Sequence, residues 1–119
     1  MESPFYEKEK IAENDHAFAV YDKYPVSEGR TLVVPKKEVS DLFELEDEDY
    51  HACFDLVKQV RKMLMDVYQP QGFNVGINNS PVAGQTIPHA HIHVIPRYKG
   101  DVKNPRGGVR NVVLGKGDY

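Results

Sequence analysis

The sequence has little of several things that define whole classes of protein. Of its 119 residues one is a cysteine, Cys53, which cannot support a disulfide framework or a cysteine-rich zinc site and fits a reducing compartment. Apolar runs are about five residues at most, against the ~20 that span a bilayer, and none follows Met1. The net charge of −3 argues against binding nucleic acid through a basic surface. We therefore expect a cytoplasmic protein with no signal peptide, membrane segment or nucleic-acid partner.

The sequence also lacks internal repeats and low-complexity linkers, and its length suits one domain over residues 1–119. Within that domain, short apolar or β-branched runs bounded by turn residues predict strands. These runs are residues 10–13, 17–21, 31–34, 73–78 and 88–94. Pro35 and Pro96 are expected to end the third and fifth strands. The glycine-rich tail from about residue 99 is expected to be irregular.

A long helix is predicted over residues 47–68, between an acidic first turn and the stop signal of Pro70 and Gly72. Mostly apolar residues recur there every three or four positions and predict a buried stripe. Its expected members are Tyr50, Cys53, Phe54, Val57, Val60, Arg61, Leu64 and Tyr68. A short helical turn is expected at residues 40–43. Strands on both sides of one long helix, several in hairpin-like pairs, predict an α+β fold with an antiparallel sheet.

Three of the five histidines, His89, His91 and His93, alternate with apolar residues in the predicted strand 88–94. Side chains on a strand point to opposite faces in turn. The three imidazoles would therefore line one face, while the apolar residues between them enter a core. Each imidazole has two nitrogens that need partners, so packing alone explains the cluster poorly.

Two chemical interpretations remain open on the residues alone. The spacing favours a metal site, because imidazoles two positions apart can converge on one ion, with Asp101, His16 or His51 as further ligands. Nucleophilic catalysis on phosphorus explains more of the sequence. Neutral imidazole is a nucleophile near pH 7, and the preceding residues 84–86, Gly-Gln-Thr, offer N–H, amide and hydroxyl groups to phosphate oxygens.

The run from Ala83 to Arg97 closely resembles the signature of the histidine-triad (HIT) family, His-φ-His-φ-His-φ-φ with φ apolar, with a small Ala90 at the first φ. Gly-Gln-Thr before the triad and Pro-Arg after it resemble the branch of Fhit-like diadenosine polyphosphate hydrolases and related bacterial proteins. Residues 17–22, 29–36 and 76–78 look like other blocks of the family, in the same order. The resemblance implies a sheet of about five strands with one long and one short helix, and a homodimer.

The resemblance also implies a nucleotidyl hydrolase that cleaves dinucleoside polyphosphates or AMP conjugates. His91 would attack the α-phosphate, and water would hydrolyse the nucleotidyl-histidine. His89 and His93 would flank His91 and bind the phosphate, and the backbone of His89 would orient the ring of His91. No metal or other cofactor is implied at the triad, and Mg²⁺ would arrive only with the substrate. The alternatives are a nucleotide-binding module with little turnover, or a nucleotidyltransferase.

Further positions match family residues that contact the ribose, the phosphate or the leaving group. They are Asp22, Asn78, Gly84, Gln85 and Thr86. The resemblance also places the base in an apolar slot, which we expect Ile11 and Phe18 to line.

The sequence departs from the family at Arg30, where many relatives carry a histidine that contacts the last triad histidine. Arginine cannot accept a hydrogen bond, and it would either raise the potential near the phosphate or turn outward. The Cys-x-x-Cys of zinc-binding relatives is lacking, so we expect no structural zinc. Arg106 and Arg110 in the tail are further candidates to touch a distal phosphate.

Overall fold

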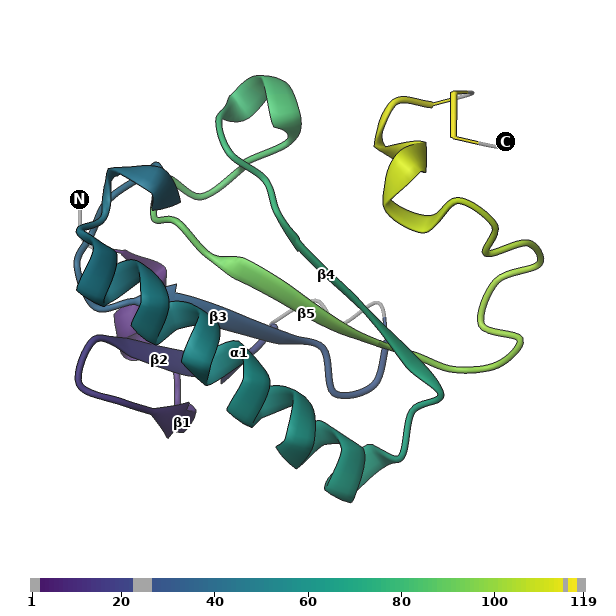
Figure 1. Cartoon of the computed structure of the whole chain (residues 1–119), viewed down its shortest axis with the longest axis horizontal. Coiled ribbons are helices and arrows are strands. Elements are labelled where there is room, and N and C mark those ends of the chain that lie inside the picture. Colours follow the sequence, from purple (N-terminus) through teal and green to yellow (C-terminus); the bar gives the residue numbers. More distant parts are fainter. Residues whose placement is uncertain (1–2, 23–26, 115, 118–119) are drawn as a thin grey trace.

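The computed structural model describes residues 3–22, 27–114 and 116–117. It has one five-stranded antiparallel sheet, in the order β1-β2-β3-β5-β4, with one long helix across one face (Figure 1). The elements are β1 (Lys10–Glu13), β2 (Ala17–Tyr21), β3 (Thr31–Pro35), α1 (Asp47–Tyr68), β4 (Gly72–Ile77) and β5 (Ile92–Arg97). Short 3-10 turns are η1 (Pro4–Glu7), η2 (Leu42–Glu44), η3 (Pro81–Ala83) and η4 (Gly108–Val112). The predicted α+β class is confirmed.

Of the two prolines, Pro35 ends its strand as predicted and Pro96 does not. Pro35 is the last residue of β3 and pairs with Ala17 of β2, and Pro96 lies inside β5 opposite Phe73 of β4. Beyond Val94, β5 pairs with β4 alone. A residue without an N–H is tolerated there because one side of the strand makes no ladder.

The main core lies between α1 and the sheet. Leu56, Val60 and Leu64 are fully buried there with Cys53. The predicted stripe is therefore partly wrong, since it omitted Leu56 and included Phe54, which is 37% exposed. The buried positions follow the i, i+3, i+4 spacing, and Phe54 lies about 100° further round the helix.

A second, smaller apolar cluster lies on the opposite face of the sheet. Phe5 of η1 covers it, and the strands contribute Phe18, Val20, Leu32 and Val34. The η1 turn covers the part of this sheet face that β2 and β3 form. The histidines lie on the same face, next to Phe5. None of the described helices is both long enough and apolar enough to cross a membrane.

Candidate active site

The histidine segment enters the sheet later than predicted. β5 begins at Ile92, so a strand over residues 88–91 is wrong. Ahead of it, the N–H of Ala90 donates to the carbonyl of Val39, 2.7 Å away in the loop after β3. β3 cannot extend the ladder here, because the carbonyl of Pro35 accepts a hydrogen bond from the ring of His89 and proline has no N–H to offer.

The three rings nevertheless lie on one side, as the alternation predicts. Ring centroids are 4.8 Å apart for His91 and His93. Phe5 contacts two of the three rings, with centroids 5.6 Å from His89 and 5.1 Å from His91. The intervening residues enter the core under α1: Ala90, Ile92 and Val94. One side of this segment therefore packs into the core, and the other side carries the three imidazoles.

The backbone determines which nitrogen of His91 carries a proton. Its Nδ1 lies 2.8 Å from the carbonyl oxygen of His89. A carbonyl oxygen only accepts, so Nδ1 donates and Nε2 keeps the lone pair of the neutral ring. The ring is 7% exposed. This places an oriented, unprotonated nitrogen beside His93.

His89 is enclosed. Its ring is 1% exposed, contacts Tyr6 as well as Phe5, and donates from Nε2 to the carbonyl of Pro35 at 2.8 Å. Nδ1 is buried and has no hydrogen-bond partner among the described residues. This geometry gives the ring no open donor for a phosphate, whereas the His89 carbonyl holds His91.

His93 is held by Arg30, which turns inward. Nη2 of Arg30 lies 3.1 Å from Nδ1 of His93, and Nε of Arg30 lies 3.1 Å from Oδ2 of Asp22. The two side chains of this ion pair are 17% and 18% exposed. Of the two orientations left open by the sequence, the structure has the one that raises the positive potential beside the triad.

Burial sets the charge of all three imidazoles. It lowers the pKa of His89 and of His91 below the ordinary value of 6.5. Burial first, then the neighbouring His91 and Arg30, lowers the pKa of His93 to about 4. The rings are therefore neutral at pH 7, which is the form required of a nucleophile.

A pocket of about 310 Å³ opens next to the last histidine. Arg30 and His93 line it together with Asn78. Val109 and Val112 of η4 complete it, because the tail lies against β4. Of the three histidines, His93 alone lines this pocket. The tail borders the pocket in the same chain, and Arg110 belongs to the same 3-10 turn.

The loop before the triad is braced by Gln85. Its Oε1 accepts from the N–H of Ser80 at 2.8 Å, and its Nε2 donates to the carbonyls of Ser40 and Ile87 at 2.9 and 3.1 Å. Gly84 has φ +99°, and a Cβ there would lie 3.9 Å from the amide of Asn78. Thr86 is exposed and lines a separate polar pocket with Ser40 and Asp41. Asn78 therefore lines the pocket next to His93, whereas Thr86 lines the separate polar pocket.

The expected base slot is not formed by the two predicted residues. Ile11 packs against the core on the α1 side of the sheet. Phe18 lies on the opposite face, 1% exposed, in the cluster with Phe5. The bulge between Lys10 and Ala12 in the β1–β2 pairing alters the alternation that would have placed the two side chains together.

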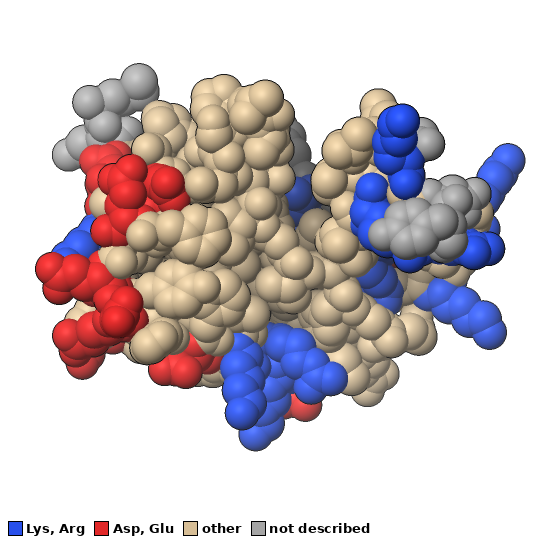
Figure 2. Space-filling view, turned by 45° about the horizontal axis from the view of Figure 1, so that its top comes forward, with Lys and Arg blue, Asp and Glu red and all other residues tan. Residues whose placement is uncertain are grey.

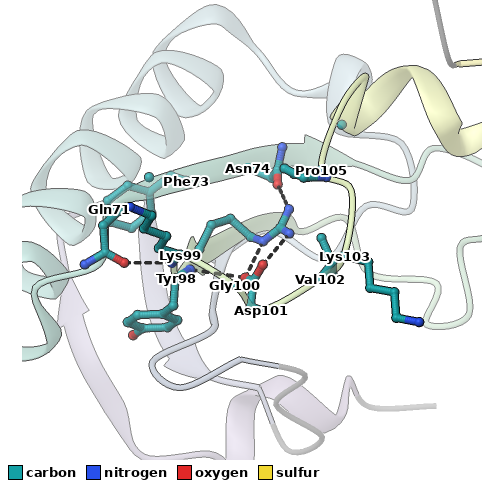
Figure 3. Close-up of a pocket in the computed structure, with 13 residues that line it drawn as sticks. Gln71, Phe73, Asn74, Tyr98, Lys99, Gly100, Asp101, Val102, Lys103 and Pro105 are labelled. Atoms are coloured by element: carbon teal, nitrogen blue, oxygen red, sulfur yellow. Dashed lines mark hydrogen bonds and ion pairs between the residues drawn. The ribbon is translucent and has the colours of Figure 1, made fainter.

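A larger pocket, of about 690 Å³, lies away from the histidines between the end of β5 and the tail. Arg97 lines it and donates to both carboxylate oxygens of Asp101 at 2.7 and 2.8 Å and to Asn74 at 2.6 Å. Asn74 and Asp101 are labelled in Figure 3. The arginine is therefore used in fastening the chain after β5 to β4. The residues that line this pocket include no histidine.

Charge is separated along the molecule although the net charge is small. Figure 2 shows Asp and Glu side chains at one end of this face, and Lys and Arg elsewhere. The tail supplies Lys99, Lys103, Arg106, Arg110 and Lys116.

No three His, Cys, Asp or Glu side chains converge on a point where a metal ion could bind, within residues 3–22, 27–114 and 116–117.

Comparison with known proteins identifies related chains. The HIT domain family matches residues 5–100. A 16.1 kDa HIT-like protein of Mycoplasma pneumoniae is 41% identical over 90 residues, which are 76% of this chain and 62% of the relative. A crystal structure of a HIT family member from Bacillus subtilis superposes with a TM-score of 0.78 at 31% identity, covering 85% of this chain and 77% of that one.

Two further relatives are named for an enzymatic activity. The AP-4-A phosphorylase of Mycobacterium tuberculosis is 35% identical over 92 residues, covering 76% of this chain and 47% of that protein. The asymmetrical bis(5'-nucleosyl)-tetraphosphatase of Schizosaccharomyces pombe is 36% identical over 77 residues, covering 65% and 42%. The chain thus spans about two fifths to three fifths of the length of these curated relatives.

Proposed function

The chain belongs to the HIT domain family, and from that premise we propose that it is a nucleotidyl hydrolase with His91 as its nucleophile. Its substrates would be dinucleoside polyphosphates or AMP conjugates, in line with the activities for which two relatives are named. The observation that carries the proposal is the hydrogen bond from Nδ1 of His91 to the His89 carbonyl, which leaves an unprotonated Nε2 next to His93.

The proposed reaction has two steps. The Nε2 lone pair of His91 forms a bond to the α-phosphorus, and the bond from phosphorus to the leaving group breaks, with the electron pair departing on the leaving group. Water then attacks the phosphorus, the N–P bond breaks, and a nucleoside monophosphate and a proton are released. His91 is neutral again and can begin another cycle.

The neighbouring residues would stabilise the charge that develops on the phosphate. His93 would donate a hydrogen bond to a phosphate oxygen, and Asn78 lines the same pocket with an amide. His89 would act mainly through its carbonyl, as a positioning residue. Asp22 would hold the ribose hydroxyls from its place beside Arg30. Gly84, Gln85 and Thr86 would shape the approach of the phosphate and the leaving group.

The test is turnover of a diadenosine polyphosphate and of an adenosine phosphoramidate by the purified chain. We expect AMP release that is abolished in His91→Ala and retained in His51→Ala, a matched change at an exposed position of α1. Tight AMP binding without turnover of either compound would instead support a binding module. Formation of ADP only when inorganic phosphate is added would indicate transfer to phosphate, as in the phosphorylase relative.

A further inference from the structure

Arg30 connects two residues of the proposed site, one just after β2 and the other on β5. Its Nε is 3.1 Å from the carboxylate of Asp22, which follows β2, and its Nη2 is 3.1 Å from Nδ1 of His93 on β5. The backbone ties the same segments together, because the N–H of Asp22 donates to the carbonyl of Arg30 at 3.0 Å. The guanidinium is thus oriented by an ion pair on one side and presents a donor on the other.

We propose that Arg30 is a positioning residue that fixes the proton of His93 on Nε2, and so keeps that nitrogen a donor toward the transferred phosphate. The inference rests on the proposed function and concerns how one group of that site is prepared. Arginine has five N–H donors and no acceptor. The nitrogen that faces it, Nδ1 of His93, must therefore supply a lone pair. A neutral imidazole with a lone pair on Nδ1 carries its single proton on Nε2.

The N–H at Nε2 of His93 can donate to a bound ligand. Nε2 of His93 is buried and has no hydrogen-bond partner within the described part of the chain. A buried N–H without a partner costs about 1–3 kcal/mol. His93 and Arg30 line the same pocket, together with Asn78. A phosphate oxygen in that pocket would supply the acceptor that the protein itself does not.

Burial first, and then His91 and Arg30, lower the pKa of His93 and keep the ring from taking a second proton, whereas Asp22 acts in the opposite direction. His93 is faced by Arg30, by His91 and by the carboxylate of Asp22. Its neighbours across the sheet are Leu32 and Gly76, which carry no charge. Protonation of Nδ1 would break the bond to Arg30 and set two cations about 3 Å apart. His93 therefore stays a neutral donor over the pH range in which His91 is an unprotonated nucleophile.

A histidine at position 30, the residue that the family resemblance gives to many relatives, would not have this effect. An imidazole can donate or accept with either nitrogen, so it permits both tautomers of its partner. Arginine permits one. Compared with a histidine, Arg30 therefore fixes the tautomer of His93 more strictly. The ion pair with Asp22 holds the arginine in place.

The direct test is ¹⁵N NMR of the imidazole rings in the substrate-free chain, which reports the tautomer and the titration of His93 without any need for activity. In the wild type we expect the Nε2–H tautomer from pH 5 to pH 8, with no titration in that range. In Arg30→Met both tautomers should appear, and the titration of His93 should move up into the range. Arg30→Gln retains an N–H donor without the charge but adds a carbonyl acceptor, so the Nε2–H tautomer should be recovered only in part, while the titration still moves up.

Kinetics on a diadenosine polyphosphate then connect the tautomer to catalysis. We expect kcat of Arg30→Met to fall about tenfold or more with little change in KM, and Arg30→Gln to recover part of it. Arg61→Met, at an exposed position of α1, is the matched control and should equal the wild type.

An Nδ1–H tautomer in the wild type would overturn the inference. An unchanged tautomer in Arg30→Met, with the loss appearing in KM, would also overturn it and make Arg30 a direct phosphate ligand. The expected tautomers in a chain without turnover would support the assignment of Arg30 and contradict the proposed hydrolase, so the two failures are distinguishable.

Discussion

Replacing His93 by glutamine should make the stability of the protein less sensitive to acid. The pKa of His93 is lowered from 6.5 to about 4 in the folded state, chiefly by burial. Below pH 6.5 the unfolded chain binds a proton at this residue that the folded chain does not bind until about pH 4. Lowering the pH in this window therefore favours the unfolded state, and the loss is complete below the folded pKa.

The size of the effect follows from the two pKa values. Between pH 7 and pH 5, His93 alone should remove roughly 1.8 kcal/mol from the free energy of unfolding, at close to 1.2 kcal/mol per pH unit near pH 5. His89 and His91 act in the same direction, since burial lowers the pKa of each. The difference between wild type and His93→Gln isolates the contribution of His93 from these and from the carboxylates.

The assay is urea unfolding followed by circular dichroism at both pH values and constant ionic strength. The wild type should lose more stability than His93→Gln by the amount given above. His51→Gln, at an exposed site on α1, should lose as much as the wild type. An equal loss in the wild type and in His93→Gln would refute the assignment of His93 as a partly buried, neutral ring.

Three other outcomes follow from the structure. Gly29→Ala should destabilise by about 2 kcal/mol, because φ is +84° and the new Cβ would lie 2.8 Å from the Tyr68 ring; Gly72→Ala, with nothing within 4 Å, should cost less than about 1 kcal/mol, and equal melting shifts for the pair would contradict this. The kcat/KM should be flat from pH 7 to pH 8 and should decrease only at a pH below that at which histidine ordinarily titrates. The reason is that burial lowers the pKa of His91, whose protonated form cannot attack; a maximum near pH 5 would be inconsistent with that role. Protein purified without a histidine tag should hold no stoichiometric zinc, copper or iron and keep its activity in chelator, whereas bound metal that is lost in a triad variant would favour the metal interpretation.

The sequence predicted most of the fold because its local signals agree with one another. The helix bounds at Asp47 and Tyr68 follow from an acidic first turn and from Pro70 beyond the end. β1 and β2 are bounded by an Asn-Asp turn whose Asn14 side chain accepts from the N–H groups of His16 and Ala17. Both depend on residues adjacent in the chain.

The errors arose where distant segments decide the structure. Residues 89–91 have the alternation of a strand, but their partners are Pro35 at the end of β3 and Val39 in the loop that follows, and no local pattern shows this. The inward turn of Arg30 depends on Asp22 and His93, which are 8 and 63 residues away. Alternation alone correctly predicted that the imidazoles share one side, because side-chain direction is a property of the extended backbone even without a ladder.

The most direct test of the account is capture of the covalent intermediate. The chain would be mixed with a diadenosine polyphosphate, quenched in alkali, which preserves N–P bonds, digested and read by mass spectrometry. We expect a transient nucleotidyl group on the peptide that contains His91, located on that ring by fragmentation and missing from His91→Ala. Rapid AMP release with no such adduct at any time, or an adduct on a different residue, would contradict His91 as the nucleophile.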